Sequence, residues 1–570
     1  MTRNRPSDRA GAPLGRLLAA GHRLTLVLLP AVLTAACLGS GWEPKPPSPP
    51  SPGPAFYALS VQVYDQDELG LEGVTARIQD SINAGREAVT DADGALSWAA
   101  LGKAGFTICL TRDDYRPTAY AVQVNGLEQS AGEGGNGCFP VTLVGSARLT
   151  VRFARQATIP VARVGQVQAD RARLYDGSGD HLFAGTTLFW SPWGYAHDRP
   201  RLEQNLAEAR KRGLDYVRVL GAVGPRGWTD RVIDPTAPDW PATVAGLTDL
   251  AYAHGLRVQW TIFGGIEKTP TKASRRAVVD RFLTALEGRH EKVILVEIAN
   301  EYWQNGFPGS DGAAELRELA ALVRTRFPGL VALGAPELAD ACVHQAAYVG
   351  SQATAVTLHY SRKSDTGEGK WRPVRQPWRE SQFTCSGVAP TYFDNEAIGP
   401  QSSVAEDDDP TRLTMARGVA WLAKNGASLL HTGAGIRGGG VEDRARGRVA
   451  NLWEVAHWDQ TTAGIQALRG LLPATLPNWA VHNAHWASAP FQADDLEAFV
   501  RNYCATQGND FVCLPIGITR PVRLTARRAM TVRVHEPLTA TVLQEVTLTA
   551  GQALDLPASR PAAVLIGRWH

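Results

Sequence analysis

The fold is decided by the stretch Lys292-Val293-Ile294-Leu295-Val296-Glu297-Ile298-Ala299-Asn300-Glu301. Apolar residues dominate it up to Ala299, which predicts a buried strand. The polar pair Asn300-Glu301 follows at the carboxyl end of that strand. In a parallel α/β barrel this end of each strand carries the catalytic groups, so Glu301 is a candidate general acid. Such an acid needs a partner from another strand.

On both sides of this stretch, short apolar runs alternate with amphipathic segments. The runs, with this one included, are 182–190, 216–220, 256–263, 293–299, 330–333, 355–360, 391–396 and 428–432. Helical spacing is clear in 202–210, and Gly213 and Gly255 end helices just before strands. Eight strands with crossovers, and 447–472 as a closing helix, predict a (β/α)8 TIM barrel over 182–475. A doubly wound open sheet is the alternative.

The segments that flank the barrel alternate between apolar and polar residues, which predicts strands. Residues 56–146 predict a β-sandwich, with turns at Asp91-Ala92-Asp93-Gly94 and Asn125-Gly126. Residues 147–181 predict β structure that leads into the barrel and caps its bottom, and 476–570 predict a second sandwich. The expected fold class is therefore multidomain, a central barrel between N-terminal and C-terminal β-sandwiches.

Residues 1–37 have the pattern of an export signal, with a basic start and an apolar run from Leu24 to Ala36. This run is too short for a membrane span. Its end, Leu33-Thr34-Ala35-Ala36-Cys37, resembles a bacterial lipobox, in which the cysteine becomes the lipidated N-terminus. An ordinary signal peptide with a chance cysteine is the alternative. Residues 38–55 are rich in proline and predict an extended linker. We expect an exported protein, either anchored by lipid to the bacterial cell envelope through Cys37 or extracellular.

The other six cysteines fall into neighbouring pairs, which suits an oxidising compartment. Pairing neighbours gives one disulfide in each presumed domain, and the pairs are Cys109 with Cys138, Cys342 with Cys385, and Cys504 with Cys513. Buried free thiols are the alternative.

Length and charge exclude several classes of partner and site. At 570 residues the chain is too long for a single core. The net charge of +2 implies no nucleic acid partner. Histidines are scattered, and no cysteine or histidine spacing predicts a zinc site, so we expect no metal. The oligomeric state does not follow from the sequence.

Polar residues gather at the predicted carboxyl ends of the strands. They are Arg218 on strand two, Asn300 and Glu301 on strand four, His359 and Tyr360 on strand six, Asp394, Asn395 and Glu396 on strand seven, and His431 on strand eight. Retaining glycosidases need two opposed carboxyl groups, one to protonate the leaving oxygen and one to attack the anomeric carbon. Glu301 and Glu396 suit these roles. A solvated Glu301, or Asp394 or Glu380 as the second carboxylate, are the alternatives.

The remaining polar residues suggest supporting roles. Arg218 is placed to hold the nucleophile ionised, or is a plain salt-bridge partner. Tyr360 is expected to donate a hydrogen bond to Glu396, and Asn300 to bind the sugar 2-hydroxyl. His359 is either a substrate ligand or a core residue, and His431 is expected to be structural.

Two motifs carry a resemblance. Ile298-Ala299-Asn300-Glu301 and Phe393-Asp394-Asn395-Glu396 resemble the superfamily of retaining (β/α)8 glycoside hydrolases that contains cellulases, mannanases and β-galactosidases. The resemblance implies that Glu301 is the acid/base, that Glu396 is the nucleophile, and that a β-linked poly- or oligosaccharide is cleaved without a cofactor. Separately, the turn at 90–94 and the strand through Cys109 resemble the carboxypeptidase regulatory-like β-sandwich.

One departure concerns aromatic stacking. The superfamily often has a tryptophan at the end of strand eight, where this chain has Leu430-His431-Thr432-Gly433-Ala434-Gly435. We expect Trp303 and Trp371 to stack on sugar instead, and the other candidates are Trp190, Trp193, Trp260, Tyr302 and Trp378. The long stretch 361–390 is expected to wall the cleft, pinned by a Cys342–Cys385 disulfide. A catalytically inert, surface-anchored lipoprotein that binds glycan or acts as a scaffold is the alternative function.

Overall fold

A computed structural model describes residues 55–570, except 66–67, 113–114, 134–136, 156–161, 227, 338–341, 361–368, 382–384, 401–406, 484–486 and 495–500. The predicted export signal, Cys37 and nearly all of the proline-rich linker lie outside these residues. Within them, no helix has the length and apolar character that a membrane crossing requires.

The centre of the molecule is a parallel eight-stranded sheet. Its strands are β13 (Phe183–Thr187), β14 (Tyr216–Leu220), β15 (Arg257–Phe263), β16 (Val293–Ala299), β17 (Leu330–Ala332), β18 (Val356–Leu358), β19 (Tyr392–Asp394) and β20 (Asn425–Leu430). Their order is β17-β16-β15-β14-β13-β20-β19-β18. The backbone N–H groups of Thr354 and Ala355, just before β18, donate to Val331 of β17 at 2.8 and 3.1 Å. The sheet therefore closes on itself, which confirms the predicted TIM barrel.

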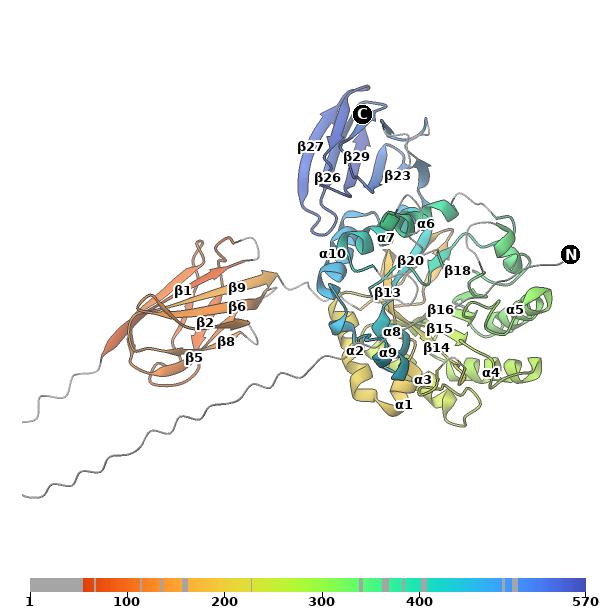
Figure 1. Cartoon of the computed structure of the whole chain (residues 1–570), viewed down its shortest axis with the longest axis horizontal. Helices are drawn as coiled ribbons and strands as arrows, with labels where there is room; N and C mark the ends of the chain where they lie inside the picture. The colour runs from red at the N-terminus through yellow and green to blue at the C-terminus, as the bar shows by residue number, and fades with distance from the viewer. Residues whose placement is uncertain are drawn as a thin grey trace, which may run out of the picture.

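Helices surround this barrel (Figure 1). In chain order they are α1 (Ser191–His197), α2 (Arg199–Lys211), α3 (Trp240–Ala253), α4 (Lys272–Ala285), α5 (Gly309–Arg324), α6 (Arg372–Ser381), α7 (Pro410–Leu422), α8 (Gly433–Arg437), α9 (Val441–Ala445) and α10 (Trp458–Leu471). A 3-10 helix, η2 (Cys342–Tyr348), follows β17. Gly213 and Gly255 have φ of 73° and 76°, a conformation that favours glycine, and they end α2 and α3 as expected.

Two predicted boundaries inside the barrel domain are wrong. The expected closing helix 447–472 is shorter, because α10 begins only at Trp458. The stretch 361–390 is not a continuous loop, since α6 occupies part of it. Trp378 of α6 stacks on Tyr503 with ring centroids 4.6 Å apart. This part of the stretch therefore packs against the C-terminal domain, and its expected role as a wall of the cleft stays a prediction.

The N-terminal domain is a β-sandwich of a five-stranded sheet, β4-β1-β9-β6-β7, and a four-stranded sheet, β3-β2-β5-β8. Their bounds are β1 (Phe56–Tyr64), β2 (Thr75–Ile78), β3 (Glu87–Val89), β4 (Ala95–Gly102), β5 (Gly105–Thr111), β6 (Tyr115–Val124), β7 (Leu127–Glu133), β8 (Cys138–Thr142) and β9 (Ala147–Arg155). The predicted boundary after residue 146 is wrong, because β9 pairs with β1 and β6 in the middle of the larger sheet.

A small sheet of β10 (Gln168–Asp170), β11 (Arg173–Asp176) and β12 (Gly179–His181) precedes the barrel. Leu174 of β11 packs so closely on Gly426 that a Cβ there would lie 2.3 Å from the leucine side chain. Gly426 is at the amino end of β20, so this sheet caps the bottom of the barrel as expected.

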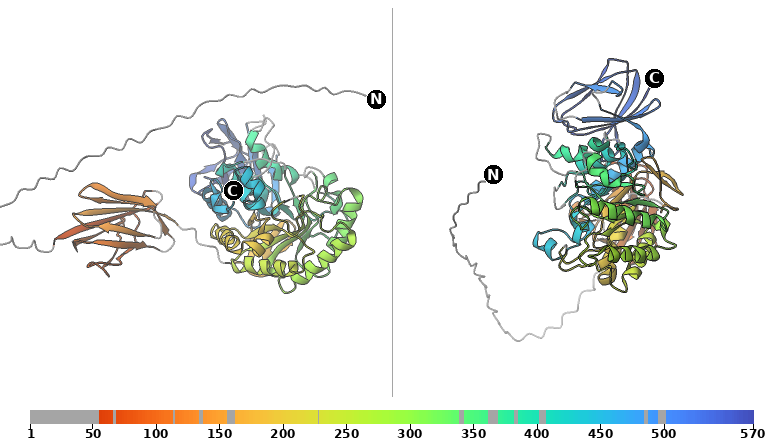
Figure 2. Two further views of the ribbon diagram at one scale, coloured as in Figure 1. Left: turned by 60° about the horizontal axis from the view of Figure 1, so that its bottom comes forward. Right: turned by 90° about the vertical axis from the view of Figure 1, so that its right-hand side faces the viewer.

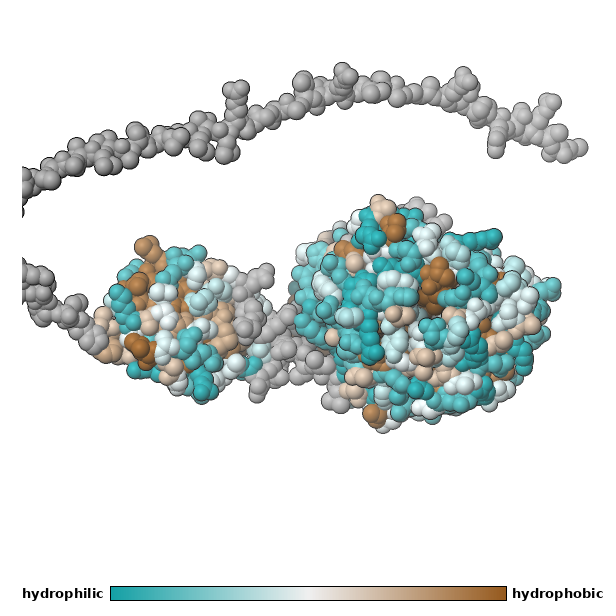
Figure 3. All heavy atoms as spheres, turned by 90° about the horizontal axis from the view of Figure 1, so that it is seen from below, coloured by the Kyte–Doolittle hydropathy of each residue, from teal (hydrophilic) through white to brown (hydrophobic). Residues whose placement is uncertain are grey.

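The C-terminal domain has a six-stranded sheet, β21-β23-β24-β29-β26-β27, and a three-stranded sheet, β22-β25-β28. The strands are β21 (Ala480–Asn483), β22 (Phe491–Ala493), β23 (Arg501–Gln507), β24 (Asp510–Ile516), β25 (Val522–Ala526), β26 (Met530–His535), β27 (Val542–Leu548), β28 (Ala553–Leu556) and β29 (Val564–Trp569). Figure 2 shows this domain against the barrel from two further sides. The face of the barrel domain seen in Figure 3 is largely hydrophilic, with small, separate hydrophobic patches.

The three predicted disulfides are present. Cys109 bonds to Cys138 in the N-terminal sandwich, Cys342 to Cys385 in the barrel domain, and Cys504 to Cys513 in the C-terminal sandwich. Each domain is thus cross-linked once by cysteines near one another in sequence.

Candidate active site

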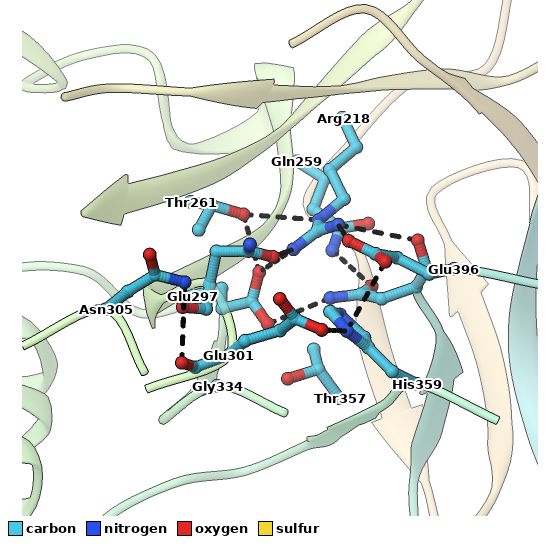
Figure 4. A network of polar contacts seen from close by, with 12 residues as sticks. Arg218, Gln259, Thr261, Glu297, Glu301, Asn305, Gly334, Thr357, His359 and Glu396 are labelled. Atoms are coloured by element: carbon cyan, nitrogen blue, oxygen red, sulfur yellow. Dashed lines mark hydrogen bonds and ion pairs between the residues drawn. The ribbon is translucent and has the colours of Figure 1, made fainter. Parts of the chain in front are cut away.

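A buried ion pair forms the floor of the barrel mouth. Arg218 of β14 and Glu297 of β16 are both 0% exposed, and Arg218 Nη2 lies 2.8 Å from Glu297 Oε2. Thr261 Oγ1 donates to the same oxygen at 2.5 Å, and Asn395 Nδ2 donates to Glu297 Oε1 at 2.8 Å (Figure 4). Both oxygens of Glu297 accept hydrogen bonds from the protein. Its buried negative charge is therefore paired with Arg218 and its desolvation is compensated.

The same arginine reaches upward to a second carboxylate. Arg218 Nη1 lies 3.4 Å from Glu396 Oε1 and 3.4 Å from the Asn395 carbonyl oxygen. Arg218 Nη2 also donates to Asn300 Oδ1 at 2.8 Å. The guanidinium therefore bridges the ends of three strands and fixes the position of the residues that follow β16 and β19.

Glu301 and Glu396 face each other across His359. The His359 Nδ1 atom lies 3.3 Å from Glu301 Oε1 and 3.6 Å from Glu396 Oε2 (Figure 4). This nitrogen and one oxygen from each glutamate all lie within 4.8 Å of one another, a spacing at which they could also hold a metal ion. The sequence-predicted carboxylates are therefore brought together, with His359 between them.

The turn after β16 aims Glu301 into this arrangement. Glu301 has a φ of 39°, in the left-handed region that a residue with a side chain rarely adopts. Asn305 Nδ2 holds the turn by donating to the Asn300 carbonyl oxygen at 2.6 Å, and Gln304 Nε2 donates to the Glu301 carboxylate. Strained backbone that is held by its neighbours in this way is concentrated at functional sites.

The two glutamates differ in their surroundings. The Glu301 side chain is 26% exposed, and that of Glu396 is 8% exposed. Glu396 contacts both Arg218 and His359, whereas Glu301 contacts His359 and Gln304. The guanidinium of Arg218 stabilises the negative charge of Glu396 electrostatically, and Glu301 is the more accessible of the two carboxylates.

Other predicted residues lie away from this centre. Tyr360 is buried, and its hydroxyl donates to Asn425 Oδ1 at 3.0 Å, which uses the one proton that we expected it to offer Glu396. Asp394, the rival second carboxylate, is 1% exposed inside the barrel and accepts from Ser428 Oγ at 3.4 Å. His431 is 3% exposed and its ring lies 5.7 Å from that of Phe189, in agreement with a structural role.

The aromatic candidates divide by burial. Trp190, Trp260 and Trp378 are fully buried in the core, so they are not stacking platforms. Trp371 is half-buried, and the Cζ atom of the Arg412 guanidinium lies over its ring, 6.0 Å from the ring centroid. Trp303 is 36% exposed and lines a pocket beside Glu301. Trp303 is therefore the better placed of the two expected platforms.

Sequence reasoning named Arg218 and Asn395 but missed two residues of the floor, Glu297 and Thr261. Glu297 stands in the middle of the stretch that defines β16, and Thr261 is inside the apolar run of β15. A signal was present, because a glutamate within a buried strand needs a cationic partner elsewhere in the core. Glu297 lies within β16, whereas Glu301 lies in the turn that follows it, so the two glutamates are held by different local structure.

No protein-family model and no curated protein sequence matches the chain. Among solved structures, one titled glycoside hydrolase has a TM-score of 0.53 at 11% identity, over 71% of this chain and 97% of that one. A glycoside hydrolase family 5 protein from Bacteroides vulgatus has a TM-score of 0.54 at 11% identity, over 71% of this chain and 94% of its own. The chain therefore has the (β/α)8 barrel fold found in these glycoside hydrolases.

Proposed function

We propose that the protein is a retaining glycoside hydrolase in which Glu301 is the acid/base and Glu396 is the nucleophile. The observation that carries the proposal is the spacing of the two carboxylates, with one oxygen from each within 4.8 Å. Retaining enzymes hold the two groups about 5–5.5 Å apart, whereas inverting enzymes need about 6.5–9.5 Å to admit a water molecule. The spacing here supports direct attack by a carboxylate.

In the first step the Glu396 carboxylate attacks the anomeric carbon while Glu301 gives its proton to the departing glycosidic oxygen. A covalent glycosyl ester forms on Glu396, and the leaving sugar departs as an alcohol. In the second step Glu301 takes a proton from water, and the hydroxide attacks the anomeric carbon. The ester bond breaks, and Glu396 returns as a carboxylate.

The floor supports both steps. Arg218 stabilises the charge of Glu396 before attack and after the ester is cleaved. The side-chain oxygen of Asn300 accepts a hydrogen bond from Arg218, which leaves its amide nitrogen to donate to the sugar 2-hydroxyl. The chemistry needs no metal or organic cofactor. The β-linkage and the poly- or oligosaccharide substrate are proposed from the resemblance of the two glutamate motifs and from the shared fold.

Export is part of the proposal. Three disulfides support an oxidising compartment such as the cell envelope. Lipid attachment through Cys37 stays a prediction of the sequence.

The proposal is tested with aryl β-glycosides of glucose, galactose, mannose and xylose. The parent protein is expected to release the aryl group from at least one of them. The Glu301→Ala variant is expected to lose about 10²–10⁴-fold of the activity on substrates that need acid assistance. Azide is expected to restore turnover and to yield a glycosyl azide of retained configuration. Inversion at the anomeric carbon, or no turnover of any glycoside or polysaccharide by the parent, would refute the proposal.

A further inference from the structure

A pocket of about 430 Å³ lies directly beside the turn that carries Glu301. Its lining comes from the residues after Glu301, the first turns of α5, Glu337 after β17, and η2. Figure 1 shows α5 beside β16, the strand that precedes Glu301. Its volume is within the range of about 300–1,000 Å³ that small-molecule sites occupy. The mechanism described above does not use this pocket.

The pocket combines an aromatic ring with polar groups. Trp303 is 36% exposed, in contrast to the core residues Trp190, Trp260, Trp378, Trp421 and Trp458. Arg317, Glu337 and His344 supply hydrogen-bond donors and acceptors to the same pocket. A sugar ring offers an apolar face for stacking and hydroxyl groups around its edge, so this lining is complementary to it.

The wall formed by η2 is fixed in place. The disulfide from Cys342 to Cys385 holds the first residue of η2. Arg317 of α5 donates to the Ala347 carbonyl oxygen at 3.3 Å, which ties the two walls together. The pocket is therefore a built feature of the barrel mouth and not a gap between surface loops.

Its position relative to Glu301 identifies which part of a substrate it would receive. An acid/base residue protonates the glycosidic oxygen of the leaving group, so the leaving sugar lies on its side of the scissile bond. Tyr302 and Trp303 follow Glu301 directly, and both line the pocket. We propose that this pocket is a subsite for a sugar ring on the leaving-group side, with Trp303 as its stacking platform. This inference rests on the proposed function, and it implies a substrate with sugar on both sides of the cleaved bond.

The test compares two substrates of the sugar that the aryl glycoside panel identifies. The first is the β-tetrasaccharide, whose leaving part is a sugar, and the second is the glycosyl fluoride, whose leaving group is too small to enter the pocket. Trp303→Ala is expected to lower kcat/KM for the tetrasaccharide about 10-fold and to leave that for the fluoride unchanged. Ala346→Trp, which fills the pocket from η2, is expected to do the same.

The matched control is Trp453→Ala, because Trp453 is 43% exposed but lies in a different part of the barrel domain. It is expected to change neither rate, and the melting temperatures of all variants report folding. Equal rates of parent and Trp303→Ala on both substrates would overturn the subsite. An equal loss on both substrates would also overturn it, since it would place Trp303 in the chemical step. Failure of the parent on every glycoside would instead overturn the proposed function.

Discussion

Arg218 contacts two carboxylates, Glu297 and Glu396, whose surroundings differ. Beneath it, Glu297 is fully buried and accepts hydrogen bonds of 2.5–2.8 Å on both oxygens. Above it, Glu396 lies 3.4 Å from Arg218 and 3.6 Å from His359, and Glu301 has a strained backbone. The floor is closed off from solvent and held by short hydrogen bonds, whereas the contacts of Arg218 and His359 to the upper pair are longer, at 3.3–3.6 Å. A rigid, neutralised floor can thus preorganise the two carboxylates that lie above it.

The largest effect is expected from the upper pair. Glu396→Gln keeps the size of the side chain but removes the nucleophile, so kcat/KM should fall on the order of 10⁴-fold or more. Steady-state kinetics on the best aryl glycoside measure the loss. Glu318→Gln, on the exposed face of α5, is the control and should retain full activity. Substantial activity of Glu396→Gln would show that another residue is the nucleophile.

A change in the floor should cost both stability and activity. Glu297→Gln leaves the buried Arg218 without its closest countercharge, so the free energy of unfolding should fall by about 3–5 kcal/mol. Arg218 should then shift toward Glu396, and kcat should fall as well.

Glu315→Gln is the matched control for the floor, because Glu315 forms a buried bidentate pair with Arg275 at 2.7 Å, outside the site. It should lower stability to a similar extent with little change in kcat well below the melting temperature. Thermal unfolding and kcat are measured for both variants. If the two have the same kcat, the floor is structural only.

The disulfide between Cys342 and Cys385, at the start of η2, gives an intermediate effect. Removing it with Cys342→Ser and Cys385→Ser together should lower stability by about 2–4 kcal/mol, because it closes a loop with a sequence separation of 43. Cys504→Ser with Cys513→Ser is the control, since that separation is 9 and the pair lies in the C-terminal sandwich. Calorimetry should show the barrel transition shifted only in the first variant. A shift of equal size in both would show that loop length does not determine the loss.

The smallest effect is expected at the other end of the barrel, at Asp215. Burial opposes the charge of its carboxylate, but Arg469 and His181 outweigh burial and hold its pKa well below the ordinary value. The folded-state pKa is depressed, so the stabilisation is present above the unfolded pKa of about 3.9 and is lost as the pH falls. Asp215→Asn should therefore lower stability by about 1–3 kcal/mol at pH 7.

Denaturation at several pH values measures this dependence. The difference in stability between the parent and Asp215→Asn should shrink as the pH falls below about 5, while kcat at pH 7 stays unchanged. A difference that grows on acidification would contradict the sign of the pKa shift.

The barrel was predictable because its strands are apolar runs of the right length. Residues 216–220 and 293–299 were predicted with the bounds that β14 and β16 have. The strand β9 was assigned to the wrong domain, since its sequence alternates in the same way whichever sheet it joins. Pairing with β1 and β6 is a tertiary event that no local pattern encodes.

The site was predictable where a polar side chain follows a strand, as Glu301 and Glu396 do, and where a charged residue interrupts an apolar strand, as Arg218 does in β14. It was not predictable where the partner is chosen by packing. Tyr360 follows β18 as expected, but its hydroxyl meets Asn425 of β20 in the interior. Glu297 was overlooked because its partner, Arg218, is 79 residues away in sequence and meets it only when the barrel closes.

The proposed mechanism requires Glu396 to form a covalent bond to the sugar. A 2-deoxy-2-fluoro β-glycoside of the preferred sugar slows hydrolysis of the glycosyl ester and lets it accumulate. Intact mass followed by peptide sequencing should show one fluoroglycosyl group per chain, attached to Glu396 and absent from Glu396→Gln. A label on another carboxylate, such as Asp394 or Glu301, or no covalent label during active turnover of the natural linkage, would contradict the account.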